Sequence, residues 1–141
     1  MKRFFFLLLV LVLICLASVS CTKQKPTLYI FNWSDYIDPS LIQEFEEQNN
    51  CRIKYSTYDS NENMLTKVKS ARESFDLLFP SGDHVSIMSE IGLLEPLDVS
   101  KLTNYKNLNG RLLDKAKSFD PGNVYSVPYF WGLTGLLYNK Q

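Results

Sequence analysis

The stretch LYIFNWSDYIDP, residues 28–39, decides the fold of this chain. Four apolar residues, 28–31, lead directly into Asn-Trp-Ser-Asp-Tyr, and Asp38 and Pro39 are suited to the N-cap and the first position of a helix. This pattern predicts a strand, a loop over residues 32–36 and a helix. Open α/β sheets bind ligands at the carboxyl ends of their strands, where this loop would lie. Its two aromatic rings and one carboxylate suit a ligand that has both methylenes and positive charges.

The alternation of strand and helix patterns continues up to residue 92. Residues 52–57 alternate like a strand with one face on the core, and residues 75–79 are nearly all apolar, which predicts the buried middle strand of a parallel sheet. Ser60 and Gly92 are the expected caps at the start of the second helix and the end of the third. The order predicts an α/β fold, a parallel-rich sheet with helices on both faces joined by right-handed crossovers. The helical side chains expected in the core are Leu41, Ile42, Phe45, Met64, Leu65, Val68, Ala71, Val85, Ile87, Met88 and Ile91.

The pattern weakens beyond residue 92. Residues 100–117 are expected to form short helical turns, and Asp-Pro-Gly-Asn at 120–123 predicts a turn. Residues 124–129 and 133–138 are expected to be extended, with Trp131 between them in hinge or core packing. The anchors expected to be buried in residues 100–117 are Leu102, Tyr105, Leu108, Leu112 and Leu113.

The N-terminus has the character of an export signal. Lys2 and Arg3 precede an apolar run, residues 4–17, which is short for a bilayer that needs about 20 residues. We therefore expect a signal peptide over residues 1–20; an uncleaved membrane anchor is the alternative. Ala-Ser-Val-Ser before Cys21 resembles the lipobox of bacterial lipoproteins, although Ser18 stands where leucine is usual. The resemblance implies lipidation of Cys21 and a tether over residues 21–27; the alternative is a plain signal cleaved nearby.

Composition limits the kinds of site and partner that this chain can have. With Cys15 in the signal and Cys21 lipidated, only Cys51 remains, so no intrachain disulfide is expected and Cys51 should be a small buried residue. His84 is the only histidine, which argues against a zinc site. Without Lys2 and Arg3 the chain has thirteen basic and fifteen acidic residues, a net charge of about −2 with no block of like charge. This balance disfavours nucleic acid as a partner.

The chain resembles the spermidine/putrescine-binding proteins, the extracytoplasmic receptors of ABC-type polyamine importers. The resemblance starts near residue 27 and lies in the segments LYIFNWSDYI (28–37), YSTYDSNE (55–62), FDLLFPS (75–81), SKLTN (100–104) and YSVPYFWG (125–132). It implies a periplasmic-binding-protein-like (type II) N-terminal lobe over residues 28–129. Residues 130–141 would be the hinge crossover strand, and the chain would end before the second lobe, so that the second lobe is missing and the chain is a fragment. The implied partners are a polyamine and a membrane permease, with no cofactor.

The resemblance also implies a ligand site. Trp33, Ser34, Asp35 and Tyr36 would line the cleft, and Ser81 would hydrogen-bond near a ligand amine. The family has an aromatic contact at the position of Asp83, so this site would exchange a ring for a carboxylate. Each residue also has a structural explanation: the two aromatic side chains could pack over the sheet edge, Asp35 could serve the turn, Ser81 could be an N-cap, and Asp83 could be a first-turn acid favoured by the helix dipole.

Three other functions remain open at this point. An enzyme on the same scaffold would need a nucleophile–base pair, and the sequence offers no evident Ser-His-Asp grouping. The ligand could instead be another small organic cation or a peptide. The chain could also be a truncated lipoprotein that binds no ligand.

Overall fold

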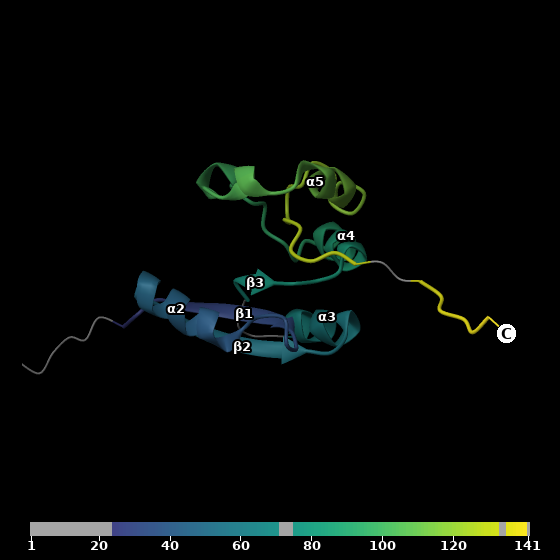
Figure 1. The fold of residues 1–141 in the computed structure, drawn as a ribbon. Helices are drawn as coiled ribbons and strands as arrows, with labels where there is room; N and C mark the ends of the chain where they lie inside the picture. The colour runs from purple at the N-terminus through teal and green to yellow at the C-terminus, as the bar shows by residue number, and fades with distance from the viewer. Residues whose placement is uncertain (1–23, 71–74, 133–134, 141) are drawn as a thin grey trace, which may run out of the picture.

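Three parallel strands in the order β2-β1-β3 form the sheet of this chain. The computed structural model describes residues 24–70, 75–132 and 135–140. Along the chain its elements are β1 (Thr27–Trp33), α2 (Pro39–Asn49), β2 (Arg52–Tyr58), α3 (Asn61–Ser70), β3 (Leu77–Leu78), α4 (Gly82–Glu90), the 3₁₀ turns η1 (Val99–Lys101) and η2 (Tyr105–Asn107), and α5 (Gly110–Ala116) (Figure 1).

Side-chain caps fix where the first two helices begin and end. The Asp38 carboxylate accepts from the Ser40 amide at 2.9 Å, with Pro39 as the first residue of α2. Asn50 ends α2 in the left-handed conformation, φ 46°, which asparagine tolerates better than most residues. The Ser60 hydroxyl accepts from the Asn63 amide at 3.2 Å and caps α3. The predicted caps of both helices are confirmed.

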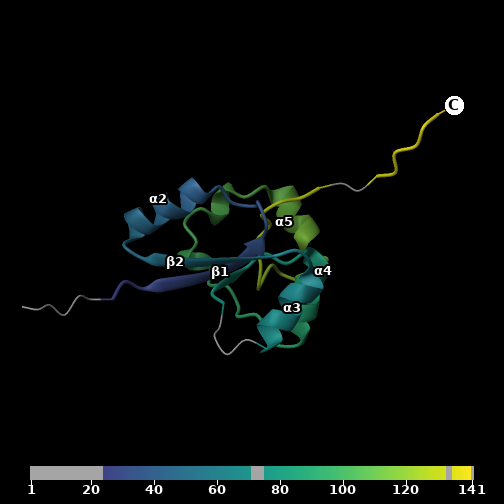
Figure 2. The same ribbon diagram turned by 90° about the horizontal axis from the view of Figure 1, so that it is seen from below.

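The strand order explains why helices lie on both faces of the sheet. The chain passes from β1 to β2 in one direction and then returns across β1 to reach β3. Right-handed crossovers in opposite directions place their helices on opposite faces. Figure 2 shows α2 on one side of the sheet and α3 on the other, as predicted.

The core lies on the face of the sheet that α3 and α4 cover. Phe31, Tyr58, Met64 and Met88 form its buried cluster. The Phe31 ring packs edge-on to Tyr58 and stacks on Phe75, with both pairs of ring centroids 4.8 Å apart. Burying an aromatic side chain of this size contributes about 2–3 kcal/mol to stability. The partly buried side chains around the cluster include Trp33, Leu65, Val68 and Leu78.

Two predictions about the strands were wrong. Strand β1 runs on to Trp33, so Asn32 and Trp33 belong to the strand and the turn begins at Ser34. The central strand is β1, whereas β3 has two residues, lies at the edge of the described sheet and leaves Leu77 44% exposed. Just before this pairing, the Asp76 amide donates to the Tyr29 carbonyl at 2.9 Å, and the Asp76 carboxylate takes the place of a backbone carbonyl by accepting from the Tyr29 amide at 2.7 Å.

Part of the predicted core is exposed. Leu41 and Phe45 are 57% and 45% exposed, and no described residue of α2 is buried. The reason is that side chains alternate along β1, so Phe31 and its cluster lie on the face opposite α2. In α4, His84, Val85 and Met88 are buried, while Ile87 is 40% exposed and Ile91, the C-cap residue, is 49% exposed. Cys51 is a free thiol and only partly buried. Ala71 lies outside the described residues.

The C-terminal part is less regular than predicted. The short helical turns between residues 99 and 116 are present, but Leu102 is 40% exposed and the other four expected anchors are only partly buried. The turn at residues 120–123 is confirmed by the hydrogen bond from the Asn123 amide to the Asp120 carbonyl, 2.8 Å. The described residues from 124 to 140 form no strand, and Leu136 and Leu137 are fully exposed. Trp131 is 70% exposed, so the predicted core packing is wrong.

The expected signal peptide and Cys21 lie outside the described residues. Within residues 24–70, 75–132 and 135–140, no helix has the length and apolar character needed to cross a bilayer.

Candidate functional site

The carboxyl ends of β1 and β3 mark the point where the chain reverses its direction across the sheet. The chain first moves from β1 towards β2 and then comes back past β1 to β3. In open α/β sheets ligands bind in the crevice at such a reversal, outside the carboxyl ends of the strands. Two segments meet there, residues 33–36 at the end of β1 and residues 79–83 after β3. Together they contain all six predicted ligand contacts.

One backbone carbonyl joins the ends of all three strands. The Phe79 carbonyl accepts from the indole Nε1–H of Trp33 at 2.8 Å and from the Tyr58 hydroxyl at 2.5 Å. Burial, and to a smaller extent the neighbouring tyrosine hydroxyls of Tyr36 and Tyr55, raise the pKa of Tyr58, so its hydroxyl stays protonated and can donate. Because the indole N–H is already used, Trp33 can offer a ligand only the faces and edges of its ring.

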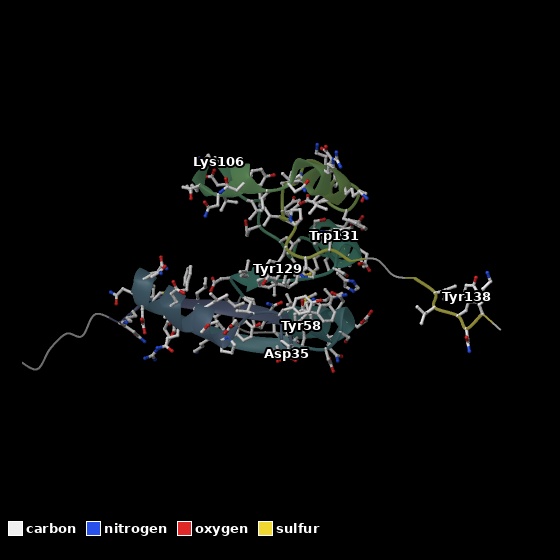
Figure 3. All side chains as sticks on the ribbon, in the orientation of Figure 1. Asp35, Tyr58, Lys106, Tyr129, Trp131 and Tyr138 are labelled. Carbon is white, nitrogen blue, oxygen red and sulfur yellow. The ribbon has the colours of Figure 1, made fainter. Side chains whose placement is uncertain are left out.

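Aromatic side chains continue outward from Trp33. Its ring centroid lies 4.7 Å from that of Tyr58 and 6.1 Å from that of Tyr36. The Tyr36 ring in turn meets Phe130 edge-on at 5.3 Å. The ring of Tyr129, labelled in Figure 3, lies beside that of Phe130, with ring centroids 4.1 Å apart.

The turn after β1 is held by its backbone. Asp35 has φ 59°, a left-handed conformation that aspartate adopts more readily than most residues. The Tyr36 carbonyl accepts from the Tyr129 hydroxyl at 2.9 Å, and the Tyr36 side chain is 40% exposed. Ser34 and Asp35 are exposed. Asp35 is therefore the turn residue that its structural explanation predicted, and its carboxylate faces solvent.

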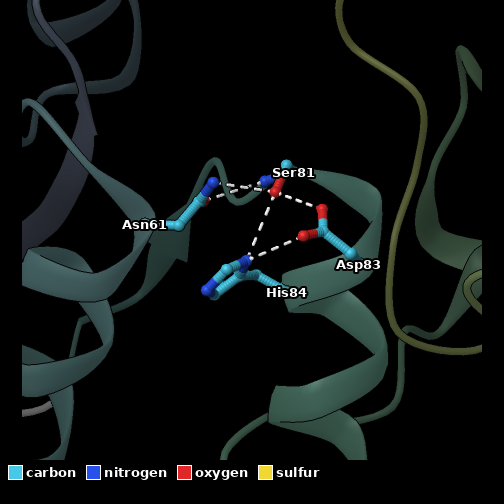
Figure 4. A network of polar contacts seen from close by, with 4 residues as sticks. All are labelled: Asn61, Ser81, Asp83 and His84. Carbon is cyan, nitrogen blue, oxygen red and sulfur yellow. Dashed lines mark hydrogen bonds and ion pairs between the residues drawn. The ribbon is translucent and has the colours of Figure 1, made fainter.

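A polar network lies on the β3 side of the site (Figure 4). The Ser81 hydroxyl donates to Asp83 Oδ1 at 2.6 Å and accepts from Asn61 Nδ2 at 2.8 Å. The Ser81 amide donates to Asn61 Oδ1 at 3.1 Å, which ties α3 to the start of α4. Ser81 occupies the N-cap position of α4, but its side chain makes no capping hydrogen bond.

Asp83 is the exposed end of this network. Its side chain is 68% exposed, and Nδ1 of the buried His84 lies 3.3 Å from its Oδ2. The hydrogen bond from Ser81, and more weakly the neighbouring His84, hold the pKa of Asp83 below its ordinary value. The carboxylate is therefore charged at neutral pH and faces solvent at the first turn of α4.

Ser81, Asp83 and His84 form a grouping that the sequence analysis missed, but its geometry does not fit nucleophilic catalysis. Both the Ser81 hydroxyl, at 3.4 Å, and the Asp83 carboxylate, at 3.3 Å, face the same ring nitrogen, Nδ1. A Ser-His-Asp relay needs the serine on one ring nitrogen and the carboxylate on the other. In the described part of the chain, no three His, Cys, Asp or Glu side chains are grouped closely enough to hold a metal ion.

Four further residues build the site without being predicted contacts. Tyr58, the last residue of β2, has the position at a strand end near the cleft and the structural part that its sequence context indicates, whereas the bonds of Asn61, the first residue of α3, to Ser81 have no sequence signal. Tyr129 and Phe130 follow Tyr36 by more than ninety residues in the sequence, and their aromatic character was the available signal that they could contribute to the site.

Comparison with known proteins identifies the family. The sequence profile of the bacterial extracellular solute-binding proteins matches residues 40–141. This chain belongs to that family. A spermidine/putrescine-binding periplasmic protein of Salmonella typhimurium is 40% identical over 125 residues, which are 88% of this chain and 35% of that protein.

Solved structures of solute-binding proteins support the same family and fold. The spermidine/putrescine ABC transporter substrate-binding protein of Streptococcus pneumoniae has a TM-score of 0.73 at 44% identity, over 77% of this chain and 33% of that one. A lipoprotein of Treponema pallidum has a TM-score of 0.69 at 41% identity, over 74% of this chain and 32% of that one. The chain thus spans about a third of the length of the solute-binding proteins that it matches.

Proposed function

We propose that this chain is part of an extracytoplasmic receptor that binds polyamines, spermidine or putrescine, for uptake by an ABC importer. The names of its relatives support this assignment. The observation that carries it is the site at the reversal of the chain, where the Trp33 and Tyr36 rings and the charged, exposed Asp83 come from the ends of neighbouring strands. Protonated amines are attracted both to aromatic faces and to carboxylates.

Each predicted contact has a distinct part in this proposal. Trp33 and Tyr36 would pack against the methylenes and bind an ammonium group over their faces. Asp83 would accept from an ammonium, while Asp35 and Ser34 would contact the ligand from the exposed turn. The Ser81 hydroxyl already donates to Asp83 and accepts from Asn61, so its main part would be to orient the Asp83 carboxylate.

The magnitudes predict weak binding by these groups alone. One charge-assisted hydrogen bond contributes about 1.5–3 kcal/mol, and each exposed cation–π contact adds about 0.5–1 kcal/mol. The sum, roughly 2.5–5 kcal/mol, corresponds to a Kd of about a millimolar. The exposed side of the site leaves much of the ligand in water, which argues against a tighter complex.

The test is a titration of the chain with spermidine, followed by NMR at the Trp33 indole N–H. MgCl₂ at equal ionic strength is the control ligand, because it supplies positive charge without methylenes. Trp33→Ala should abolish the response of the remaining site resonances to spermidine, and Trp131→Ala, a change at an exposed tryptophan, should preserve it. Equal responses to spermidine and Mg²⁺ in the parent chain would refute the proposal.

The location is the second part of the proposal. We infer that residues 1–20 are a signal peptide, that Cys21 carries the lipid, and that the residues between Cys21 and the start of β1 at Thr27 tether the domain to a membrane near the permease. The lipobox-like sequence before Cys21 and the lipoprotein relative in Treponema pallidum support this. Radiolabelled palmitate should enter the parent and Cys51→Ser but not Cys21→Ser, and label remaining in Cys21→Ser would contradict it.

The arrangement of the domain follows the same proposal. Residues 28–129 would be the N-terminal lobe, and residues 130–141 would lead across the hinge. No cofactor or nucleic acid takes part in this function.

A further inference from the structure

The side chain of Asp120 is a buried carboxylate outside the site described above. It follows α5, is 2% exposed and accepts four hydrogen bonds. Three come from consecutive backbone amides, those of Val124 at 3.0 Å, Tyr125 at 2.9 Å and Ser126 at 2.8 Å, and the fourth from the Ser126 hydroxyl at 2.9 Å. Amides that converge on one carboxylate fix the backbone that carries them.

The turn that holds Asp120 is itself anchored to the domain. Asn123, 5% exposed and left-handed at φ 51°, donates from Nδ2 to the Leu113 carbonyl in α5 at 3.1 Å. The Ser86 hydroxyl of α4 donates to the Phe119 carbonyl at 2.6 Å. The carboxylate therefore has a fixed place relative to α4, the helix that carries Asp83.

The backbone that Asp120 holds leads directly to the Tyr36 turn. Three residues beyond Ser126, the Tyr129 hydroxyl donates to the Tyr36 carbonyl at 2.9 Å. The Phe130 ring meets the Tyr36 ring at 5.3 Å, and the Tyr129 ring meets Phe79 at 5.0 Å. Residues 124–130 thus connect the buried carboxylate to both halves of the site.

We infer that Asp120 is a positioning residue of the polyamine site. By fixing the backbone of residues 124–126 it holds Tyr129 and Phe130 against Tyr36, and so sets where the Tyr36 ring meets the ligand. This inference rests on the proposed function for the part that Tyr36 plays in binding. The alternative is that Asp120 stabilises only its own turn.

The first test compares Asp120→Asn with Asp114→Asn in the full chain, kept in mild detergent because of its apolar N-terminal segment. Asp120 accepts from the Val124 amide through Oδ1 and from the Tyr125 and Ser126 amides through Oδ2, so the N–H₂ group of the replacement faces one or two amide donors in either orientation. Asp114 is an exposed carboxylate paired with Lys117 on the surface of α5. Amide exchange at residues 124–126 should become at least about tenfold faster in Asp120→Asn only, as expected for loss of a charge-assisted hydrogen bond.

The deciding readout is at Tyr36, which a local role of Asp120 would not change. We expect Asp120→Asn to weaken the nuclear Overhauser contact between the Tyr36 and Phe130 rings and to shift the Tyr36 carbonyl ¹³C resonance. Faster exchange at residues 124–126 with an unchanged Tyr36 carbonyl and ring contact would overturn the inference.

A milder pair of variants covers the case in which Asp120→Asn does not fold. Ser126→Ala removes one of the four hydrogen bonds to Asp120 and keeps the carboxylate. Ser118→Ala is its control, because that hydroxyl donates to the Lys115 carbonyl in the last turn of α5 and makes no bond to Asp120. Ser126→Ala should produce a smaller shift of the Tyr36 carbonyl in the same direction; an unshifted Tyr36 carbonyl in this variant would overturn the inference.

A spermidine titration of the same samples separates this inference from the proposed function. The response of the parent should fall in Asp120→Asn and persist in Asp114→Asn. A parent that does not respond to spermidine, with a Tyr36–Phe130 contact that still depends on Asp120, would refute the polyamine function and support the positioning of Tyr36. A full spermidine response in a folded Asp120→Asn would overturn the positioning.

Discussion

The shared acceptor at Phe79 makes a quantitative prediction about stability. Tyr58→Phe removes one of two donors to the Phe79 carbonyl and keeps the buried ring. Since Trp33 Nε1 still donates at 2.8 Å, no buried group is left without a partner. The loss should therefore be that of one ordinary hydrogen bond, about 1 kcal/mol. For a domain of this size it corresponds to a fall in Tm of about 4 °C.

The double variant is the stronger test. Trp33→Phe alone removes the other donor and part of the ring, but Tyr58 still satisfies the carbonyl. Removing both donors leaves a partly buried carbonyl unpaired, which costs an additional 1–3 kcal/mol or so. The double variant Tyr58→Phe/Trp33→Phe should thus lose about 1 kcal/mol or more beyond the sum of the single changes.

Urea unfolding followed by far-ultraviolet circular dichroism measures the loss of unfolding free energy in the two single variants and the double variant. It does not depend on tryptophan fluorescence, which Trp33→Phe would change. Tyr138→Phe is the matched control, because that tyrosine is 79% exposed in the C-terminal segment, well away from the site (Figure 3). Additive losses, within about 0.5 kcal/mol, would refute the idea that one carbonyl joins the strand ends.

Two further predictions concern the start of α4. Gly82→Ala should destabilise the domain by about 1–3 kcal/mol, because a Cβ there would lie 2.5 Å from the Phe119 ring. Gly110→Ala is the control, because Gly110 has the same position in α5 and open space around it, so this change should not destabilise the domain. Equal unfolding midpoints of the two variants would contradict the prediction. Because the Ser81 hydroxyl lowers the pKa of Asp83 below 3.8, the contribution of this carboxylate to binding should be present at neutral pH and be lost as pH falls through the lowered value. Ser81→Ala should raise that pKa towards 3.8, and an unchanged ¹³C titration of Asp83 would refute the assigned cause.

Local chemistry made much of the fold predictable. Asp38, Ser60 and Asn50 each act within a few residues of their own position, so the bounds of α2 and the start of α3 follow from the sequence. The regular alternation of strand and helix patterns is enough to predict a parallel sheet with helices on both faces.

The strand order and the extent of burial could not be predicted from the sequence in the same way. An apolar strand pattern predicts burial but not which neighbour a strand will have, so the pattern of β3 wrongly predicts a central strand. The stripe of α2 has helical spacing, yet its burial depends on what lies opposite, and Leu41 and Phe45 face few described partners.

The candidate site residues come from the resemblance more than from their spacing, and their contact with a ligand stays a prediction. Aromatic and acidic residue types indicated the turn after β1, but the acceptor that joins Trp33 to Tyr58 is a backbone carbonyl, which has no sequence signature. The direction of the Ser81 hydroxyl depends on Asp83 and Asn61 together. Asp120 had only the character of a turn residue, because its amide partners become neighbours only when the turn closes.

The short pairing of β3 has a consequence for the order in which the chain folds. Strands β1 and β2 pair along seven residues each, while β3 joins β1 through two pairs of residues, between positions 47 apart in the sequence. Loop-closure entropy and the small number of contacts both favour early formation of the β1–α2–β2 unit and late docking of β3. Since Phe79 and Ser81 arrive with β3, the candidate site forms only after β3 has docked. A nascent chain with a complete first crossover would carry the Trp33 ring without the Phe79 carbonyl that holds its indole N–H.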